Sequence, residues 1–142
     1  MKLVVASDHA GRHLKKSVFL YLKDSGYEVE DLGVDDSVGR ADYPDLACPL
    51  AEAVAGGQYD LGFLVCGTGI GMAMAANRIK GARAANCTNE FMVRMARAHN
   101  NANILTLGER VIGEGLALDL VDLFLNSSFE GGRHQLRVDK FN

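Results

Sequence analysis

The sequence predicts an α/β fold: one domain of three layers, with a doubly wound parallel sheet of five strands and helices on both faces. Three observations lead to this prediction. Short apolar runs alternate with longer segments whose apolar residues recur at helical spacing. The central run, 61–66, passes through three alternate glycines into an Ala/Met-rich segment, which is the order strand, turn, helix. The length of 142 residues allows one hydrophobic core, so we expect residues 1–142 to form a single domain.

The first strand and helix follow from composition and spacing. Lys2 to Ala6 is short, β-branched and apolar, as in a buried strand. From Arg12 to Ser25, apolar residues recur at near-helical spacing, and the lysines, Lys15 among them, are expected largely on the opposite side. Gly26 would end this helix as the residue just past the C-cap.

The next segments predict an edge strand, a loop and a second helix. Tyr27 to Leu32 alternates apolar and acidic residues, which indicates a strand nearer the sheet edge. Residues 33–44 carry charges and glycines, as a surface loop does. Residues 45–55 place apolar side chains on one helical face, and Gly56-Gly57 stops this helix. The helix after the central strand is expected to run to Arg78.

The second half of the chain predicts two more strands and two more helices. They occupy residues 83–88 and 104–107 for the strands, and 89–98 and 113–126 for the helices. Thr88 or Asn89 is a suitable N-cap for the first of these helices. From Ser127 the pattern fades into a tail with glycines and arginines. This alternation favours a Rossmann-like sheet with right-handed crossovers.

Composition and charge exclude several classes of function. A net charge of −3 gives no footprint for nucleic acid or an anionic membrane. The most apolar late segment, 116–125, is interrupted by Asp119 and Asp122, so we expect no membrane span. Three cysteines are an odd number and no apolar leader precedes them, which favours the reducing cytoplasm. The spacing of the cysteines indicates no metal site.

The glycine turn after Cys66 matches neither common nucleotide-binding motif. The dinucleotide fingerprint needs Gly-x-Gly-x-x-Gly, but here Met72 stands where the third glycine belongs. No Lys-Ser/Thr pair closes the turn as a phosphate loop requires. The turn is therefore either a tight strand-to-helix connection or an anion site at a helix N-terminus. Cys66 is either a small buried hydrophobe or a thiol that the helix dipole favours as thiolate.

Chemistry-bearing residues fall at two places in the predicted fold. Asp8 and His9 follow the first strand and Cys66 follows the third, and the carboxyl ends of parallel strands share one rim, where ligands bind. His99 follows a helix that returns across the sheet, so it belongs at the opposite rim. If His99 serves the Cys66 site, a second subunit must deliver it.

The tail contains two arginines four residues apart, Arg133 and Arg137. Arginines at this spacing form either a solvated helix face or a pair of forks that hold a phosphate. The sequence assigns no role to His134 between them.

Taken together, these motifs resemble the type B ribose-5-phosphate isomerases, a family that includes galactose-6-phosphate isomerase subunits. The resemblance covers nearly the whole chain. It rests on Asp8-His9, Cys66-Gly67-Thr68-Gly69-Ile70-Gly71 with Ala75-Ala76-Asn77, His99-Asn100, Gly108-Glu109-Arg110, and Gly131-Gly132-Arg133-His134 with Arg137.

The resemblance implies aldose–ketose isomerisation of a phosphorylated sugar without metal or organic cofactor. Cys66 would remove the proton from C2 of the open-chain sugar, and His99 would assist ring opening with Thr68 close by. The enediolate would be held by the amides of the turn, from Gly67, Gly69, Ile70 and Gly71. One branch of the family uses a glutamate at the position of Met72 instead of the cysteine, so this chain belongs with the cysteine branch.

The resemblance also implies the remaining contacts and the assembly. Asp8, His9 and Asn100 would bind substrate, and the arginines of the tail, 127–142, would hold the phosphate. Arg110 would join the site at a subunit boundary in a homodimer or tetramer. Tyr43 and the 33–42 loop would set pocket length, which no motif measures. A pentose such as ribose 5-phosphate is favoured, and allose 6-phosphate or galactose 6-phosphate stays open. A flavodoxin-like domain that binds a phosphate ligand without turnover is the alternative of another class.

Overall fold

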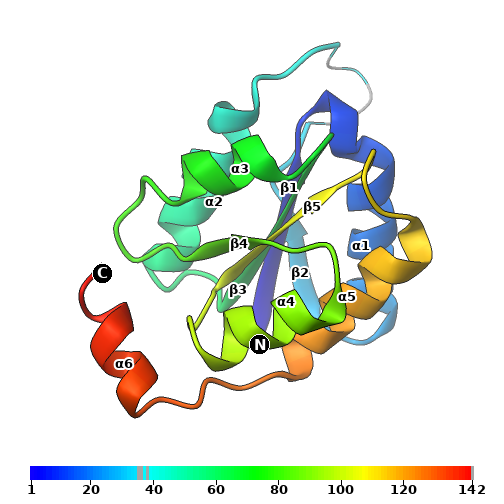
Figure 1. The fold of residues 1–142 in the computed structure, drawn as a ribbon. Helices are drawn as coiled ribbons and strands as arrows, with labels where there is room; N and C mark the ends of the chain where they lie inside the picture. The colour runs from blue at the N-terminus through cyan, green and yellow to red at the C-terminus, as the bar shows by residue number, and fades with distance from the viewer. Residues whose placement is uncertain (35–36, 38, 142) are drawn as a thin grey trace.

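The computed structural model describes residues 1–34, 37 and 39–141, and contains one five-stranded parallel sheet. The strand order is β2-β1-β3-β5-β4 (Figure 1). The strands are β1 Lys2–Ser7, β2 Glu28–Asp31, β3 Leu61–Cys66, β4 Ala84–Asn86 and β5 Ile104–Gly108. The helices are the 3-10 turn η1 His9–Gly11, α1 Arg12–Asp24, α2 Tyr43–Ala55, α3 Ile70–Ala76, α4 Glu90–Ala98, α5 Glu114–Asn126 and α6 Arg133–Val138. The predicted α/β class with a five-stranded parallel sheet is confirmed.

Helices cover both faces of the sheet, and each face has its own core. On one face, α1, α4 and α5 pack against alternate residues of the central strands, including Leu3, Phe63 and Leu105. On the other face, α2 and α3 pack against Val4 and Leu64. Side chains alternate across a strand, so the continuous apolar run of β3 supplies both cores.

The strand order places the topological switch point between β1 and β3. From β1 the chain moves outward to β2 and then returns to β3 on the other side of β1. The ends of the two strands are in register, with Ser7 opposite Val65. Gly11 lies so close to β3 that a Cβ there would meet the Val65 carbonyl at 2.6 Å. The loops after β1 and β3 therefore share one rim, as the sequence predicts.

Several boundaries differ from the predicted ones. The strand predicted at 83–88 is only three residues long, and Cys87 follows it as a buried side chain. The helix predicted at 45–55 begins two residues earlier, at Tyr43, with Pro44 in its first turn, where a missing N–H costs nothing. The predicted loop over 33–44 is thus shorter, and residues 35, 36 and 38 of it lie outside the described residues.

The prediction that Lys15 points away from the core is wrong. Lys15 is buried on α1, and its Nζ lies 2.6 Å from Asp31 Oδ2 at the end of β2. Its apolar stem packs along the sheet while the ammonium reaches a carboxylate, which makes a buried lysine tolerable.

The tail is also more ordered than the fading pattern predicts. Residues 133–138 form α6, which buries His134 and Val138. Gly131 and Gly132 have φ values of +67° and +55°, and this left-handed backbone turns the chain sharply into the helix. A six-residue helix is too short to show a clear apolar period, which explains the missed element.

Candidate active site

Cys66 ends β3 at the shared rim and is 5% exposed. Its Sγ accepts a hydrogen bond from the Gly69 N–H at 3.1 Å. Gly69 is the N-cap of α3 and has a φ of +81°, a conformation that favours glycine. The turn therefore curls back on itself so that a backbone N–H points at the thiol sulfur.

Close packing fixes the shape of this turn. A Cβ on Gly69 would collide with Asn86 Oδ1, and a Cβ on Gly108 would lie 2.6 Å from the Thr68 carbonyl. The Asn86 side-chain amide donates to the Thr68 carbonyl at 3.4 Å, and the Thr106 hydroxyl donates to Asn86 Oδ1 at 3.2 Å. Side chains of β4 and β5 thus hold the turn on the side opposite β1.

The loop after β5 adds a cation to the rim. The N–H groups of Glu109 and Arg110 donate to the carbonyls of Cys66 and Gly67 at 2.9 and 3.0 Å. The Arg110 side chain lies over Gly67, where a Cβ would be 3.5 Å from Cδ and Nη1. Arg110 therefore lies at the Cys66 rim of its own chain.

The loop after β1 completes the rim. Asp8 is 7% exposed, and its side chain accepts a hydrogen bond from the Ala10 N–H at 2.9 Å. His9 Nδ1 lies 3.2 Å from the carbonyl oxygen of Ala41, which ties the ring to the segment before α2. The Tyr43 ring covers Gly71, where a Cβ would lie 2.9 Å from Cζ.

The remaining predicted residues form a second cluster. His99 is the C-cap of α4, and its ring stacks on the buried His134 ring with centroids 4.1 Å apart and planes at 9°. Glu130 Oε2 lies 3.8 Å from His99 Nε2 and 3.5 Å from His134 Nε2. Arg133 and Arg137 belong to the same helix as His134.

The two clusters lie at opposite ends of the sheet. Helix α4 starts directly after β4 and returns, and its nine residues span about 14 Å. Beyond the far end of α4, the carbonyl of Asn103 accepts a hydrogen bond from the Gly62 N–H at the start of β3. One chain therefore unites Asp8, His9, Tyr43, the glycine turn and Arg110, and separately unites His99, Asn100, Arg133 and Arg137. Figure 1 shows α6 at the opposite end of the molecule from α3.

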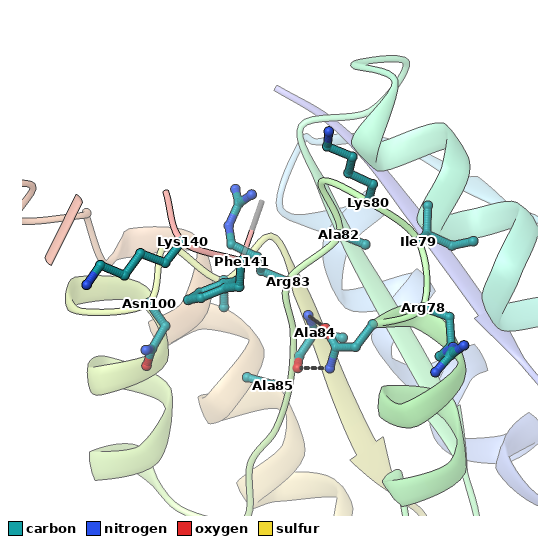
Figure 2. Close-up of a pocket in the computed structure, with 12 residues that line it drawn as sticks. Arg78, Ile79, Lys80, Ala82, Arg83, Ala84, Ala85, Asn100, Lys140 and Phe141 are labelled. Carbon is teal, nitrogen blue, oxygen red and sulfur yellow. Dashed lines mark hydrogen bonds between the residues drawn. The ribbon is translucent and has the colours of Figure 1, made fainter. Parts of the chain in front are cut away.

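A hollow of about 730 Å³ lies at the edge beside β4, and Cys66 is not among the residues that line it (Figure 2). Its lining includes Asn100 and four cations, Arg78, Lys80, Arg83 and Lys140. Figure 2 shows the charged ends of Arg78, Lys80 and Lys140 on separate sides of the hollow, so they do not converge on one ligand. A second hollow along the same edge is lined by Asn86, Phe91 and Asn100 among others.

Three contributors to these clusters escaped the sequence analysis. Asn86 falls within the predicted strand 83–88, Glu130 falls within the predicted tail, and Glu109 belongs to a motif that assigns it no role. Glu109 Oε2 accepts the Leu14 N–H at 3.0 Å, so it caps α1 from 95 residues away. In the sequence, positions like these appear only as an isolated polar residue beside small residues or glycines, which is a weak signal.

The one side-chain group of metal-ligand type found among the described residues is His99, Glu130 and His134, whose ligand atoms lie within 4.8 Å of one another. No helix in the described part of the chain combines the length and apolarity that a membrane span requires.

Comparison with known proteins gives close matches over the whole chain. The Ribose/Galactose Isomerase family model matches residues 3–141. The chain is 45% identical to a putative sugar phosphate isomerase of Bacillus subtilis over 142 residues, covering 100% of this chain and 95% of that protein. It is 44% identical to ribose-5-phosphate isomerase B of Escherichia coli, covering 97% and 92%. It is also 39% identical to a D-erythrulose-4-phosphate isomerase of Pectobacterium atrosepticum, covering 99% and 92%.

Solved structures agree with this result. Ribose-5-phosphate isomerase B of Clostridium thermocellum superposes with a TM-score of 0.96 at 52% identity, covering 99% of this chain and 94% of that one. The Mycoplasma genitalium enzyme with bound ribulose-5-phosphate superposes with a TM-score of 0.93 at 44% identity, covering 98% and 92%.

Proposed function

The chain belongs to the ribose/galactose isomerase family, and we propose that it interconverts ribose 5-phosphate and ribulose 5-phosphate. Relatives named for this activity match along nearly their whole length. The observation that carries the proposal is the thiol of Cys66, held at the switch-point rim with a backbone N–H aimed at its sulfur.

In this proposal the sulfur of Cys66 takes the proton from C2 of the open-chain aldose. The electrons of that C–H bond form a C1–C2 double bond and leave negative charge on the C1 oxygen. Return of a proton to C1, with loss of the proton on the C2 hydroxyl, gives the ketose. A proton next to a carbonyl is a weak acid, so the base is useful only where the oxyanion is stabilised. The amides of Gly67, Gly69, Ile70 and Gly71 are the donors we assign to that task.

Ring opening requires an acid that donates a proton to the ring oxygen. We assign this task to His99 of a second copy, with Thr68 beside the thiol. The same copy would bring Asn100 and the arginine pair of α6, while Arg110, Asp8 and His9 come from the copy that supplies the thiol. Each arginine can donate two parallel hydrogen bonds to a phosphate, which suits a phosphorylated sugar.

A homodimer is therefore part of the proposal. Large apolar side chains are exposed beside β4, including Phe91 at 66% and Met74 at 69%, and Leu136 on α6 is exposed at 68%. Two hollows run along this edge. A second copy that covers this edge would bury these side chains and bring its His99 toward the other chain's Cys66.

The first experiment measures conversion of ribose 5-phosphate to ribulose 5-phosphate by the purified protein in the presence of a chelator. Turnover should survive the chelator, because no metal takes part in the proposed steps. Cys66→Ala should remove nearly all turnover, and Cys48→Ala, at a half-buried cysteine on α2, should retain it. Normal turnover in Cys66→Ala would overturn the assignment of the base. Phosphate-ligand binding without any turnover would favour a binding domain.

The substrate is tested in the same assay. The relative from Pectobacterium atrosepticum is named for a four-carbon sugar phosphate, so the fold accommodates more than one chain length. Rates on ribose 5-phosphate, allose 6-phosphate and erythrose 4-phosphate should rank the pentose first. A faster hexose reaction would leave the chemistry intact and change only the substrate.

Subunit mixing tests the shared site. Cys66→Ala should be inactive and His99→Ala should keep only a small residual activity, and a hybrid dimer holds one intact site of two. Random exchange of equal amounts should therefore restore about a quarter of the wild-type activity. No recovery after proven exchange would show that both residues act within one chain.

A further inference from the structure

The segment before α6 is anchored to the end of α4 by backbone groups. The Glu130 N–H donates to the Ala98 carbonyl at 3.0 Å, and the Arg97 side chain donates to the Ser127 carbonyl at 3.3 Å. The backbone of Glu130 is thereby held against Ala98, the residue that precedes His99. The left-handed Gly131 and Gly132 then turn the chain back over His99.

This turn brings His134 face to face with His99. The rings are nearly parallel, at 9°, with centroids 4.1 Å apart. His134 is 5% exposed, whereas the side chain of His99 is 37% exposed. The buried ring therefore forms a floor on which the accessible ring lies, and it limits rotation of His99 about its χ2 bond.

Glu130 fixes the edge of the ring in the same way. Its Oε2 faces the Nε2 atoms of both histidines, at 3.8 Å from His99 and 3.5 Å from His134. A carboxylate in this place attracts N–H groups and so favours one of the two ring flips of His99. Stacking and carboxylate together define the plane and the orientation of the His99 imidazole.

Charge supports a division of roles between the two rings. Burial lowers the pKa of His134, and His99, Arg133 and Arg137 act in the same direction, while Glu130 opposes them. These are the charged and titratable groups that act on His134 from α4, from the segment before α6 and from α6 itself. A neutral His134 can lie against a protonated His99, whereas two stacked imidazolium rings would repel each other.

The geometry is unsuited to a metal site, although His99, Glu130 and His134 are all metal-ligand types. An imidazole binds zinc in the plane of its ring, with a Zn–N distance of about 2.0–2.1 Å. Two rings whose planes lie nearly parallel cannot both direct a lone pair at one ion. The arrangement is that of a stacked pair beside a carboxylate.

We infer that His134 and Glu130 are positioning residues that orient His99 as the ring-opening acid of the partner subunit's site. The inference rests on the proposed function, because it takes the role of His99 from there. It adds a role to His134 and Glu130, and it predicts that both act only through His99.

The decisive experiment is a double-mutant cycle. His134→Ala should lower kcat on ribose 5-phosphate about tenfold, and Glu130→Gln should lower it by a smaller factor in the same direction. In a His99→Ala background, measured through its residual activity, each second substitution should change kcat by less than about twofold. Equal losses in both backgrounds would overturn the inference.

A separate readout distinguishes positioning from loss of the phosphate grip. Displacement of α6 would move Arg133 and Arg137, so KM and the inhibition constant of inorganic phosphate would rise. Positioning predicts that both stay within about twofold while kcat falls. His134→Phe retains a stacking ring and should recover part of the kcat lost in His134→Ala. A rise in the phosphate inhibition constant with unchanged kcat would contradict the inference.

Two further controls complete the design. His13→Ala removes an exposed histidine on α1 and should leave kcat unchanged. Glu130 is 60% exposed, so Glu130→Gln tests the inference even if His134→Ala fails to fold.

Erythrose 4-phosphate cannot close a five-membered ring, because its C4 oxygen carries the phosphate. If the chain turns it over, His134→Ala should slow that reaction less than the ribose reaction.

The two failures are distinguishable. Full activity of Cys66→Ala or His99→Ala would overturn the proposed function itself. Suppose instead that those variants lose activity and that substitution of His134 lowers kcat equally with and without His99. That outcome would overturn only the inference.

Discussion

The rim at Cys66 and the cluster at His99 are built by different means. At the rim, most of the donors are backbone N–H groups: Gly69 donates to the thiol, and the loop after β5 donates to the carbonyls of Cys66 and Gly67. At the cluster, side chains from α4 and from the segment around α6 make the contacts. The first arrangement tolerates no added atom, and the second tolerates exchange of one side chain for a similar one. Substitutions should therefore act more sharply at the rim.

The largest effect is expected from Gly69→Ala. The new Cβ would collide with Asn86 Oδ1 at a φ of +81°, so the N–H would leave the sulfur of Cys66. The proposal also assigns this N–H to the enediolate oxygen, and loss of one oxyanion donor costs about 10²-fold or more in turnover. Gly57→Ala is the matched control, because its φ is +79° with nothing within 4 Å of the Cβ. Both variants should have lower melting temperatures, and only Gly69→Ala should lose kcat/KM. Equal kcat/KM in the two would refute the rigid rim.

A smaller effect, and one of another kind, is expected at the cluster. Arg137→Met should raise KM about tenfold and change kcat less, because the phosphate contact proposed for Arg137 would be made equally in the ground state and transition state. Lys16→Met removes an exposed charge from α1 and should leave both constants unchanged. Steady-state kinetics on ribose 5-phosphate checks both variants. A fall in kcat alone would move Arg137 from binding to chemistry.

Glu109→Ala should lower stability by about 1 kcal/mol, the usual effect of losing a helix cap. The N-cap residue of α1, Gly11, has no side chain, and the Glu109 carboxylate accepts the Leu14 N–H in its place. Urea unfolding measures the change, with Glu52→Ala on the exposed side of α2 as the control. Stability identical to the wild type would show that the link between the β5 loop and α1 is dispensable.

The smallest effect is expected from substitution of Cys87, the buried residue that directly follows β4. Burial raises the pKa of its thiol from its ordinary value of 9.0 to about 11. The folded state thus holds the proton more tightly, so this group's contribution is complete below pH 9 and is lost as the pH rises toward 11. The stability of Cys87→Ala should decline less over that interval than the stability of the wild type. Parallel declines would show that the thiol does not contribute.

The sequence was sufficient for features that depend on local pattern. Strand β3 and its glycine turn were predicted because an apolar run and three glycines are visible without knowledge of the fold. The position of His99 at the far rim followed from the alternation of strands and helices alone. Thr88 or Asn89 was predicted as the N-cap of α4, and the structure has Asn89 there, with its side chain accepting the Met92 N–H at 3.0 Å.

Features that depend on distant neighbours were not predictable. Lys15 is buried because Asp31 lies beside it, and no helical period reveals that partner. Asn86 matters because β4 lies beside β5, next to the glycine turn, a placement that strand order alone decides. The contact between His99 and His134 depends on two left-handed glycines, whose conformation the sequence permits without requiring.

The strand order has a consequence for synthesis on the ribosome. Among the described strands, β4 pairs only with β5, which is made after it, and β5 also covers the open side of β3. A nascent chain that ends before residue 104 therefore holds β4 without a partner and β3 with an exposed edge. Gly108 and Arg110, which complete the surroundings of Cys66, emerge later still. The thiol site is consequently among the last parts of the molecule to form, and a stalled chain carries the cysteine before it carries the surroundings that orient it.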